Sequence, residues 1–139
     1  MPNFSKSSKQ KLSECHPKLQ ALFNEVIRYY DCAVIVGHRG EAQQNQAFIE
    51  GRSKFKYPQS KHNSMPSRAA DVVPYFSNPP NIRWDDREKF YHFGGFVQGI
   101  AEKLGIDIRW GGDWDSDGEL HDQTFFDFPH FELRWSHEE

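Results

Sequence analysis

Three side chains that can bind a metal ion stand at positions where an ionisable group is costly unless it has a partner. His62 ends a long polar loop, Asp71 interrupts the apolar run 69–74, and His130 follows Pro129 near the end of the chain. Two imidazoles and one carboxylate leave the fourth position of a tetrahedral Zn²⁺ ion open, as in catalytic zinc sites. The three residues therefore predict a metal site that acidifies a water molecule and polarises a carbonyl group.

Two further residues could serve hydrolysis at such a site. Asp127 lies three residues before His130 and could take a proton from the attacking water. Arg39, two residues after the apolar run 33–37, could stabilise an oxyanion or bind a substrate carboxylate. Structural interpretations stay open as well: Asp71 could cap a strand end, His130 could be a hydrogen-bonded core histidine, and Arg39 could form a salt bridge.

The same residues carry a resemblance to a known enzyme family. The resemblance rests on three short motifs that contain the candidate ligands and the candidate base: Ser60-Lys61-His62, Ala69-Ala70-Asp71 and Asp127-x-x-His130-x-Glu132-Leu133. These motifs resemble the signature of the zinc peptidases that cut peptidoglycan stem peptides, the D-alanyl-D-alanine and L-alanyl-D-glutamate peptidases with the Hedgehog-type fold. The resemblance covers roughly residues 20–135 and is strongest to the short single-domain endolysins of phages.

The resemblance implies a role for each of these side chains. His62, Asp71 and His130 would be the zinc ligands, Asp127 the general base, and Arg39 the arginine that stabilises the transition state. An aspartate as the base suggests the L-alanyl-D-glutamate branch, so the implied reaction is hydrolysis of that bond in bacterial peptidoglycan. The alternatives are a D-alanyl-D-alanine carboxypeptidase on the same scaffold and a non-catalytic wall-binding module.

Two other polar residues are candidates for supporting roles. Ser60 could orient the loop or His62 through a hydrogen bond, as metal ligands commonly require. His121 could contact the substrate or orient a ligand, or it could only form a hydrogen bond within its loop.

A second metal signal lies in the segment 113–118. Its sequence D-x-D-x-D-G matches the opening of an EF-hand calcium loop, but Thr124 occupies the twelfth position, where the EF-hand has a bidentate glutamate. A calcium-responsive loop beside the active site is one interpretation, and an ordinary acidic turn is the other. The candidate calcium ligands are Asp113, Asp115, Asp117, Glu119 and Asp122.

Motifs of several other enzyme classes are absent from the sequence. There is no His-Glu-x-x-His helix, no G-x-S-x-G elbow and no P-loop. The segment 130–132 has the His-x-Glu pattern of zinc deaminases, but no Cys-x-x-Cys follows it. The common metalloprotease plan, serine hydrolysis, nucleotide binding and base deamination are therefore disfavoured.

The elements that must position these side chains can be predicted from hydrophobic spacing. Residues 1–16 are polar and either partly helical or loose, and residues 52–68 form a loop whose length suggests a functional role. The fold class is α+β, a small mainly antiparallel sheet covered by about three helices. The spacing predicts helices over 17–31, 41–50 and 85–104, and strands over 33–37, 69–74, 106–110 and 128–135.

Composition limits the range of functions. The 139 residues, of 16.3 kDa, fit one domain, and an aromatic fraction of 15% argues against intrinsic disorder. A net charge of −3 disfavours nucleic acid as a partner, and two cysteines are too few for a disulfide framework. We therefore expect a single monomeric zinc peptidase domain over residues 1–139, without a separate cell-wall-binding domain.

The sequence shows no signal for export or for membrane insertion. No apolar stretch approaches the length of a membrane span, and the first residues lack the apolar core of a signal peptide. We therefore expect an endolysin made in the host cytoplasm, which acts on the cell wall after a separate holin-type membrane protein releases it.

Overall fold

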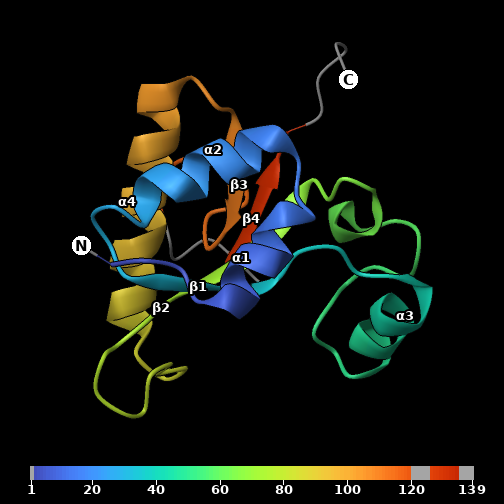
Figure 1. The fold of residues 1–139 in the computed structure, drawn as a ribbon. Coiled ribbons are helices and arrows are strands. Elements are labelled where there is room, and N and C mark those ends of the chain that lie inside the picture. Colours follow the sequence, from blue (N-terminus) through green and yellow to red (C-terminus); the bar gives the residue numbers. More distant parts are fainter. Residues whose placement is uncertain (1, 120–125, 135–139) are drawn as a thin grey trace.

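The computed structural model describes residues 2–119 and 126–134, in which four strands form one antiparallel sheet in the order β1-β2-β4-β3. Helices lie beside this sheet, so the α+β class is confirmed (Figure 1). The strands are β1 Cys32–Val36, β2 Ala69–Pro74, β3 Ile108–Gly111 and β4 Asp127–Leu133. The helices are α1 Lys6–Ser13, α2 Pro17–Val26, α3 Glu41–Ile49 and α4 Arg87–Leu104, with the short 3₁₀ helix η1 at Lys61–Asn63.

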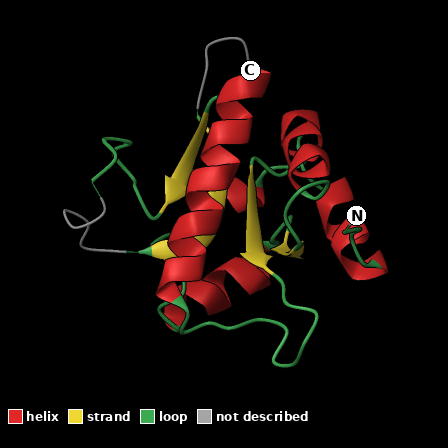
Figure 2. Ribbon diagram, turned by 90° about the vertical axis from the view of Figure 1, so that its left-hand side faces the viewer, coloured by secondary structure: helices red, strands yellow, loops and turns green. Residues whose placement is uncertain are grey.

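One face of the sheet packs against helices. Helix α4 crosses the strands and contacts β2, β3, β4 and α2 (Figure 2). The rings of Phe23 and Phe93 meet that of Phe131 edge to face, with centroids 5.5 and 5.9 Å apart. Because successive side chains of a strand point to opposite faces, a core Phe131 places His130 and Glu132 on the other face. The hydrophobic core therefore dictates which face carries the polar residues.

The opposite side of the molecule is built by α3 and the segment that leads to η1. Figure 1 shows these parts well apart from α4. This segment lies within the long loop predicted over 52–68. The short helix η1 also lies in this loop, and the hydrophobic spacing did not predict it. The loop thus supplies a wall that faces the polar side of the sheet, and it delivers His62 to that side.

The element boundaries follow local signals with a few exceptions. Strand β2 has the predicted bounds, and α4 begins after Asp86, whose side chain accepts a hydrogen bond from the Lys89 amide, and ends at Gly105 with φ of +72°. Helix α2 ends at Val26, earlier than predicted. The amides of Arg28 and Tyr29 bond to the carbonyls three residues before them, as in a 3₁₀ turn, so the regular α-helical pattern stops there. Helix α1 lies within the segment 1–16 that was expected to be partly helical or loose; it begins at Lys6, and Ser5 caps it.

Several further boundaries differ from the prediction by one or two residues, and β1 lies one residue earlier than expected at both ends. Strand β3 begins at Ile108, two residues later than expected, and β4 begins one residue earlier, at Asp127. The predicted end of the last strand at residue 135 lies outside the described residues. Within the described chain, none of the helices is long and apolar enough to span a lipid bilayer.

Candidate metal centre

The sheet register brings two of the predicted ligands together. Asp71 of β2 lies directly opposite His130 of β4, and Asp71 Oδ1 is 3.4 Å from His130 Nδ1. His62 reaches the same carboxylate from η1, with Nε2 3.0 Å from Asp71 Oδ1. All three residues are buried, and one ligand atom of each lies within 4.8 Å of the others. Side chains far apart in the sequence thus form one compact group that could bind a metal ion.

His62 is oriented by the backbone around it. Its Nδ1 lies 2.8 Å from the carbonyl oxygen of Gly37, and because a carbonyl only accepts, Nδ1 donates this bond. The Nε2 lone pair is then directed toward Asp71. Ser60 caps η1, and its hydroxyl accepts a hydrogen bond of 3.2 Å from the His62 amide. Ser60 therefore shapes the turn that presents His62.

His130 is held from both sides by carboxylates. Nδ1 faces Asp71, and Nε2 donates to Glu132 Oε1 at 2.8 Å. Burial lowers the pKa of His130, but the hydrogen bonds to Asp71 and Glu132 outweigh it and raise the pKa to about 10. Burial raises the pKa of Asp71, but the two histidines hold it well below its usual range. A metal ion that binds here must displace the histidine proton from Nδ1.

The donor set fits a tetrahedral divalent cation with an open position. Three donor atoms converge, His62 Nε2, Asp71 Oδ1 and His130 Nδ1, and the second nitrogen of each imidazole bonds to a protein oxygen. This hydrogen bonding fixes imidazole tautomers in metal sites. Nitrogen and oxygen donors in this number suit zinc in a catalytic rather than a closed structural site.

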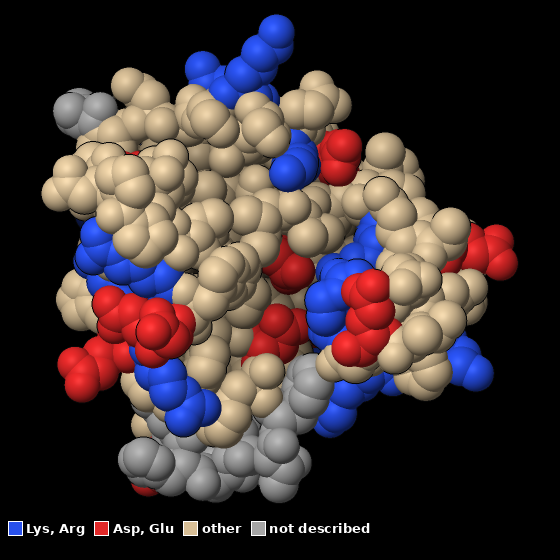
Figure 3. Space-filling model, turned by 90° about the horizontal axis from the view of Figure 1, so that it is seen from below, with Lys and Arg blue, Asp and Glu red and all other residues tan. Residues whose placement is uncertain are grey.

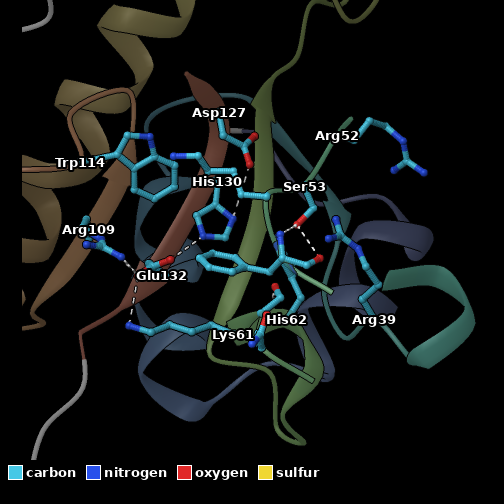
Figure 4. Close-up of a pocket in the computed structure, with 14 residues that line it drawn as sticks. Arg39, Arg52, Ser53, Lys61, His62, Arg109, Trp114, Asp127, His130 and Glu132 are labelled. Carbon is cyan, nitrogen blue, oxygen red and sulfur yellow. Dashed lines mark hydrogen bonds and ion pairs between the residues drawn. The ribbon is translucent and has the colours of Figure 1, made fainter. Parts of the chain in front are cut away.

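Asp127 lies at the start of β4, beside the converging donors. Its Oδ2 is 3.9 Å from His130 Nδ1, and its side chain borders the pocket next to the group (Figure 4). Burial raises the pKa of Asp127 to about 6, with a further contribution from the negative charge of Asp71, against the opposing effects of His130 and Arg39. The residue is thus a carboxylate that is more basic than usual.

Arg39 approaches from the loop after β1. Its Nη2 is 3.5 Å from Asp71 Oδ2, so the ion pair expected of a structural arginine is present, and the same side chain also lines the pocket. Nη1 donates to Gln44 Oε1 at 3.1 Å. Gln44 is fully buried and its amide nitrogen also donates to Ser53 Oγ and to the carbonyl of Phe55. This amide fixes the guanidinium and ties α3 to the pocket wall, a role that helical periodicity alone did not indicate.

Glu132 is a buried residue of the site to which the motif assigned no role. Lys61 and Arg109 both approach its carboxylate, at 3.1 and 2.9 Å. Burial raises the pKa of Glu132, but His130, Lys61 and Arg109 together lower it to about 2. The signal that could have found it is the two-residue spacing from His130, which puts both side chains on one face of a strand.

The acidic loop brings three of its carboxylates together. One oxygen each from Asp113, Asp115 and Asp117 lies within 4.8 Å of the others. Asp113 is buried, its Oδ2 accepts from the Gly118 amide, and its Oδ1 has no hydrogen-bond partner among the described residues. The amide of Glu119 donates to Asp117. Asp122, a further candidate calcium ligand, and His121, a candidate to contact the substrate or orient a ligand, lie outside the described residues.

Trp114 connects this loop to the donor group. Its ring is 5.5 Å from the ring of His130, and the Arg109 guanidinium lies 5.3 Å from the Trp114 ring centre. The acidic loop therefore packs directly against the site.

Amide hydrolysis needs a way to activate water, a group that accepts the proton of the water and a group that stabilises an oxyanion. The donor group, Asp127 and Arg39 are candidates for these three tasks. Arg39, His62, Asp127 and His130 line one pocket of about 140 Å³, and Asp71 contacts three of these four side chains. The fold and this arrangement are those expected of a hydrolase whose site could hold a metal ion.

Comparisons with known proteins make the class specific. The sequence model of the family described as "Phage L-alanyl-D-glutamate peptidase" matches residues 2–134. The L-alanyl-D-glutamate peptidase of Escherichia phage T5 is 32% identical over 135 residues, which cover 94% of this chain and 96% of that protein. The crystal structure of the Serratia marcescens L-Ala D-Glu endopeptidase ChiX matches with a TM-score of 0.73 at 25% identity, over 95% of this chain and 90% of that chain.

This chain therefore belongs to the phage L-alanyl-D-glutamate peptidase family. The family and the peptidase activity predicted from three short motifs are both confirmed.

Proposed function

We propose that this protein is a zinc endopeptidase that cuts the bond between L-alanine and D-glutamate in the stem peptide of bacterial peptidoglycan. The observation that carries the proposal is the convergence of His62, Asp71 and His130 at one border of a pocket. These residues would hold the metal ion, and zinc is the divalent ion that two imidazoles and one carboxylate suit best. When bound, zinc lowers the pKa of a water molecule and polarises the substrate carbonyl.

Asp127 acts as the general base in this proposal. It is close enough to the donor group to accept the proton of the attacking water, and its raised pKa strengthens it as a base. The same carboxyl group can then pass the proton to the nitrogen of the leaving amine. Arg39, held by Gln44, donates hydrogen bonds to the oxygen on which negative charge develops.

The charge of the pocket suits the D-glutamyl side of the substrate. D-glutamate has two carboxyl groups, and only one can continue the peptide, so the other is an anion. Seen from below, the surface is hollowed near its centre, where acidic atoms lie next to basic side chains (Figure 3). The chain carries a net charge of −3, but basic residues outnumber acidic ones in the pocket lining. The acidic residues are Asp127 and Glu132, and the basic ones are Arg39, Arg52, Lys54, Lys61 and Arg109.

The termini of the products test the proposed bond. Digestion of purified peptidoglycan is expected to expose new N-terminal D-glutamate, detected by mass spectrometry after labelling of free amines. Heat-inactivated protein is the control for pre-existing ends. Release of free D-alanine without new D-glutamate termini would instead assign the carboxypeptidase reaction and overturn the endopeptidase assignment.

We further propose that catalysis needs only this one domain, acting as a monomer. The described residues share one hydrophobic core, which supports a single folding unit. Because the family is a phage peptidase family and its substrate lies outside the cytoplasmic membrane, we propose synthesis in the host cytoplasm. A separate holin-type membrane protein would then give access to the wall at lysis.

We also propose that Asp113, Asp115 and Asp117 bind Ca²⁺ next to the active site. The buried, unpartnered Oδ1 of Asp113 among the described residues supports this proposal. Burial and the charges of the other two aspartates raise the pKa of Asp113, against the Gly118 hydrogen bond, and a cation would relieve this repulsion. Glu119 and Asp122 are further candidate ligands.

Calcium is expected to bind this loop with a dissociation constant of about 10⁻⁴–10⁻³ M, because the bidentate glutamate of tight EF-hands is missing. Isothermal titration calorimetry of the zinc-loaded protein measures this binding, and the double change Asp115→Asn, Asp117→Asn should remove it. The exposed Asp85, changed to asparagine, is the matched control and should keep it. A parent protein that shows neither calcium binding nor a calcium effect on activity would leave only an acidic turn.

A further inference from the structure

The side chain of Glu132 connects the metal site to two cations, Lys61 and Arg109. We propose that Glu132 is a positioning residue, which fixes the ring plane and the tautomer of His130 and thereby sets the affinity for the metal. Lys61 and Arg109 hold Glu132 in place. This inference rests on the proposed function, because it takes His130 as a metal ligand.

The sheet register places these residues in one row. His130 and Glu132 are two positions apart on β4, so their side chains share a face. Asp71 lies opposite His130 on one neighbouring strand, and Arg109 lies opposite Glu132 on the other. The row runs from the candidate ligand Asp71 through His130 and Glu132 to Arg109. Strand pairing alone places these four residues together.

The hydrogen bonds along this row select one tautomer of His130. Glu132 Oε1 lies 2.8 Å from His130 Nε2, and an ionised carboxylate can only accept, so Nε2 carries the hydrogen. The lone pair of the neutral ring is then on Nδ1, the atom that faces Asp71. Without Glu132 the ring could rotate or adopt the other tautomer, and either change would direct the lone pair away from the metal.

Two cations keep Glu132 ionised and immobile. Lys61 Nζ lies 3.1 Å from Oε2, while Arg109 donates to the same oxygen from Nη2 at 2.9 Å and from Nε at 3.2 Å. The side chains of Glu132 and Lys61 are only 6% and 10% exposed. A buried carboxylate needs such partners, because an isolated charge in that environment is costly.

Lys61 also ties together the two segments that carry histidines. It precedes His62 in η1, and its ammonium group donates both to Glu132 and to the carbonyl of Leu133 at 2.6 Å. Figure 4 shows this side chain reaching from the loop that bears His62 to Glu132 and Arg109. The ion pair therefore sets the spacing between η1 and β4 and so between the two imidazoles.

Glu132→Gln tests the inference, because it keeps the size of the side chain and removes its charge. Competition with a chromophoric chelator is expected to show zinc binding weakened by about 10–100-fold, the usual cost of losing a group that orients a metal ligand. The absorption spectrum of the Co²⁺-loaded variant should also shift, because the geometry at His130 changes. Glu25→Gln removes a glutamate–arginine pair on the surface of α2 and is the matched control.

Arg109→Gln is a second, milder variant in case Glu132→Gln does not fold. Its side chain is 38% exposed, and its loss frees Glu132 on one side only, so a several-fold weakening of zinc binding is expected. Unchanged zinc affinity and an unchanged Co²⁺ spectrum in the folded variants would overturn the positioning role and leave a purely structural ion cluster. A parent protein that does not bind zinc would instead overturn the proposed function itself.

Discussion

Asp127→Asn is expected to lower the rate of stem-peptide hydrolysis by a factor of about 10²–10⁴, the usual contribution of a general base. Asparagine has nearly the same shape, but its amide cannot accept the proton of the attacking water. Zinc content should stay at one ion per chain, because the three converging donor atoms belong to other residues. A large loss of rate with an intact metal site is the combination that identifies a base.

Turnover of a purified stem peptide and metal analysis of the same samples measure these two effects. Asp107→Asn is the matched control, because Asp107 is an exposed aspartate paired with Arg134. A variant with the parent rate would place the base elsewhere. A variant that loses its zinc would make Asp127 a ligand rather than a base.

The pH dependence gives a second view of the same group. The pKa of Asp127 is raised to about 6, and a base works only when deprotonated, so the rate should fall as the pH drops through this value. A bound cation lowers the pKa of a nearby carboxyl group, which moves the fall to or below about pH 6. The remaining activity of Asp127→Asn should lack this step, and a step that persists unchanged would belong to another group.

The parts of the site that sequence predicted are those with a local chemical signature. Asp71 and His130 stand out because each is an ionisable group inside an apolar segment that the hydrophobic pattern already assigns to a strand. Strand β2 and helix α4 have equally clear local signals, an apolar run and a cap at each end. Such features depend on neighbours in the chain, so periodicity and spacing reveal them.

The parts that sequence did not predict depend on contacts between distant segments. Glu132 meets Arg109 only because β3 and β4 pair in one particular register, and Lys61 reaches it across the pocket from η1. The buried amide of Gln44 is similar, since its partners Arg39 and Ser53 come from segments before and after α3. Charged and amide side chains on the surface have the same sequence signature as these, so only the tertiary structure separates them.

Removing the metal ion is expected to abolish hydrolysis and to leave the fold in place. Dialysis against a strong chelator should reduce activity to background, with little change in far-UV circular dichroism, because α2, α4 and the hydrophobic core lie on the other face of the sheet. One equivalent of Zn²⁺ should restore activity, whereas Mg²⁺ should not, since nitrogen donors bind magnesium poorly. Activity that survives in verified metal-free protein would contradict a metal-dependent mechanism.

His62→Ala tests whether the activity that Zn²⁺ restores depends on the donor group of His62, Asp71 and His130. With one of three ligands removed, zinc affinity should fall by more than about 100-fold, beyond the cost of losing a group that only orients a ligand. His92→Ala is the matched control, because His92 is an exposed histidine on α4 that bonds Tyr30. Zinc binding at parent affinity in His62→Ala would mean that the ion binds elsewhere. A selective loss at His62 would show that a histidine from a loop and a carboxylate from a strand act as one site, because the sheet and η1 bring them within bonding distance of the same ion.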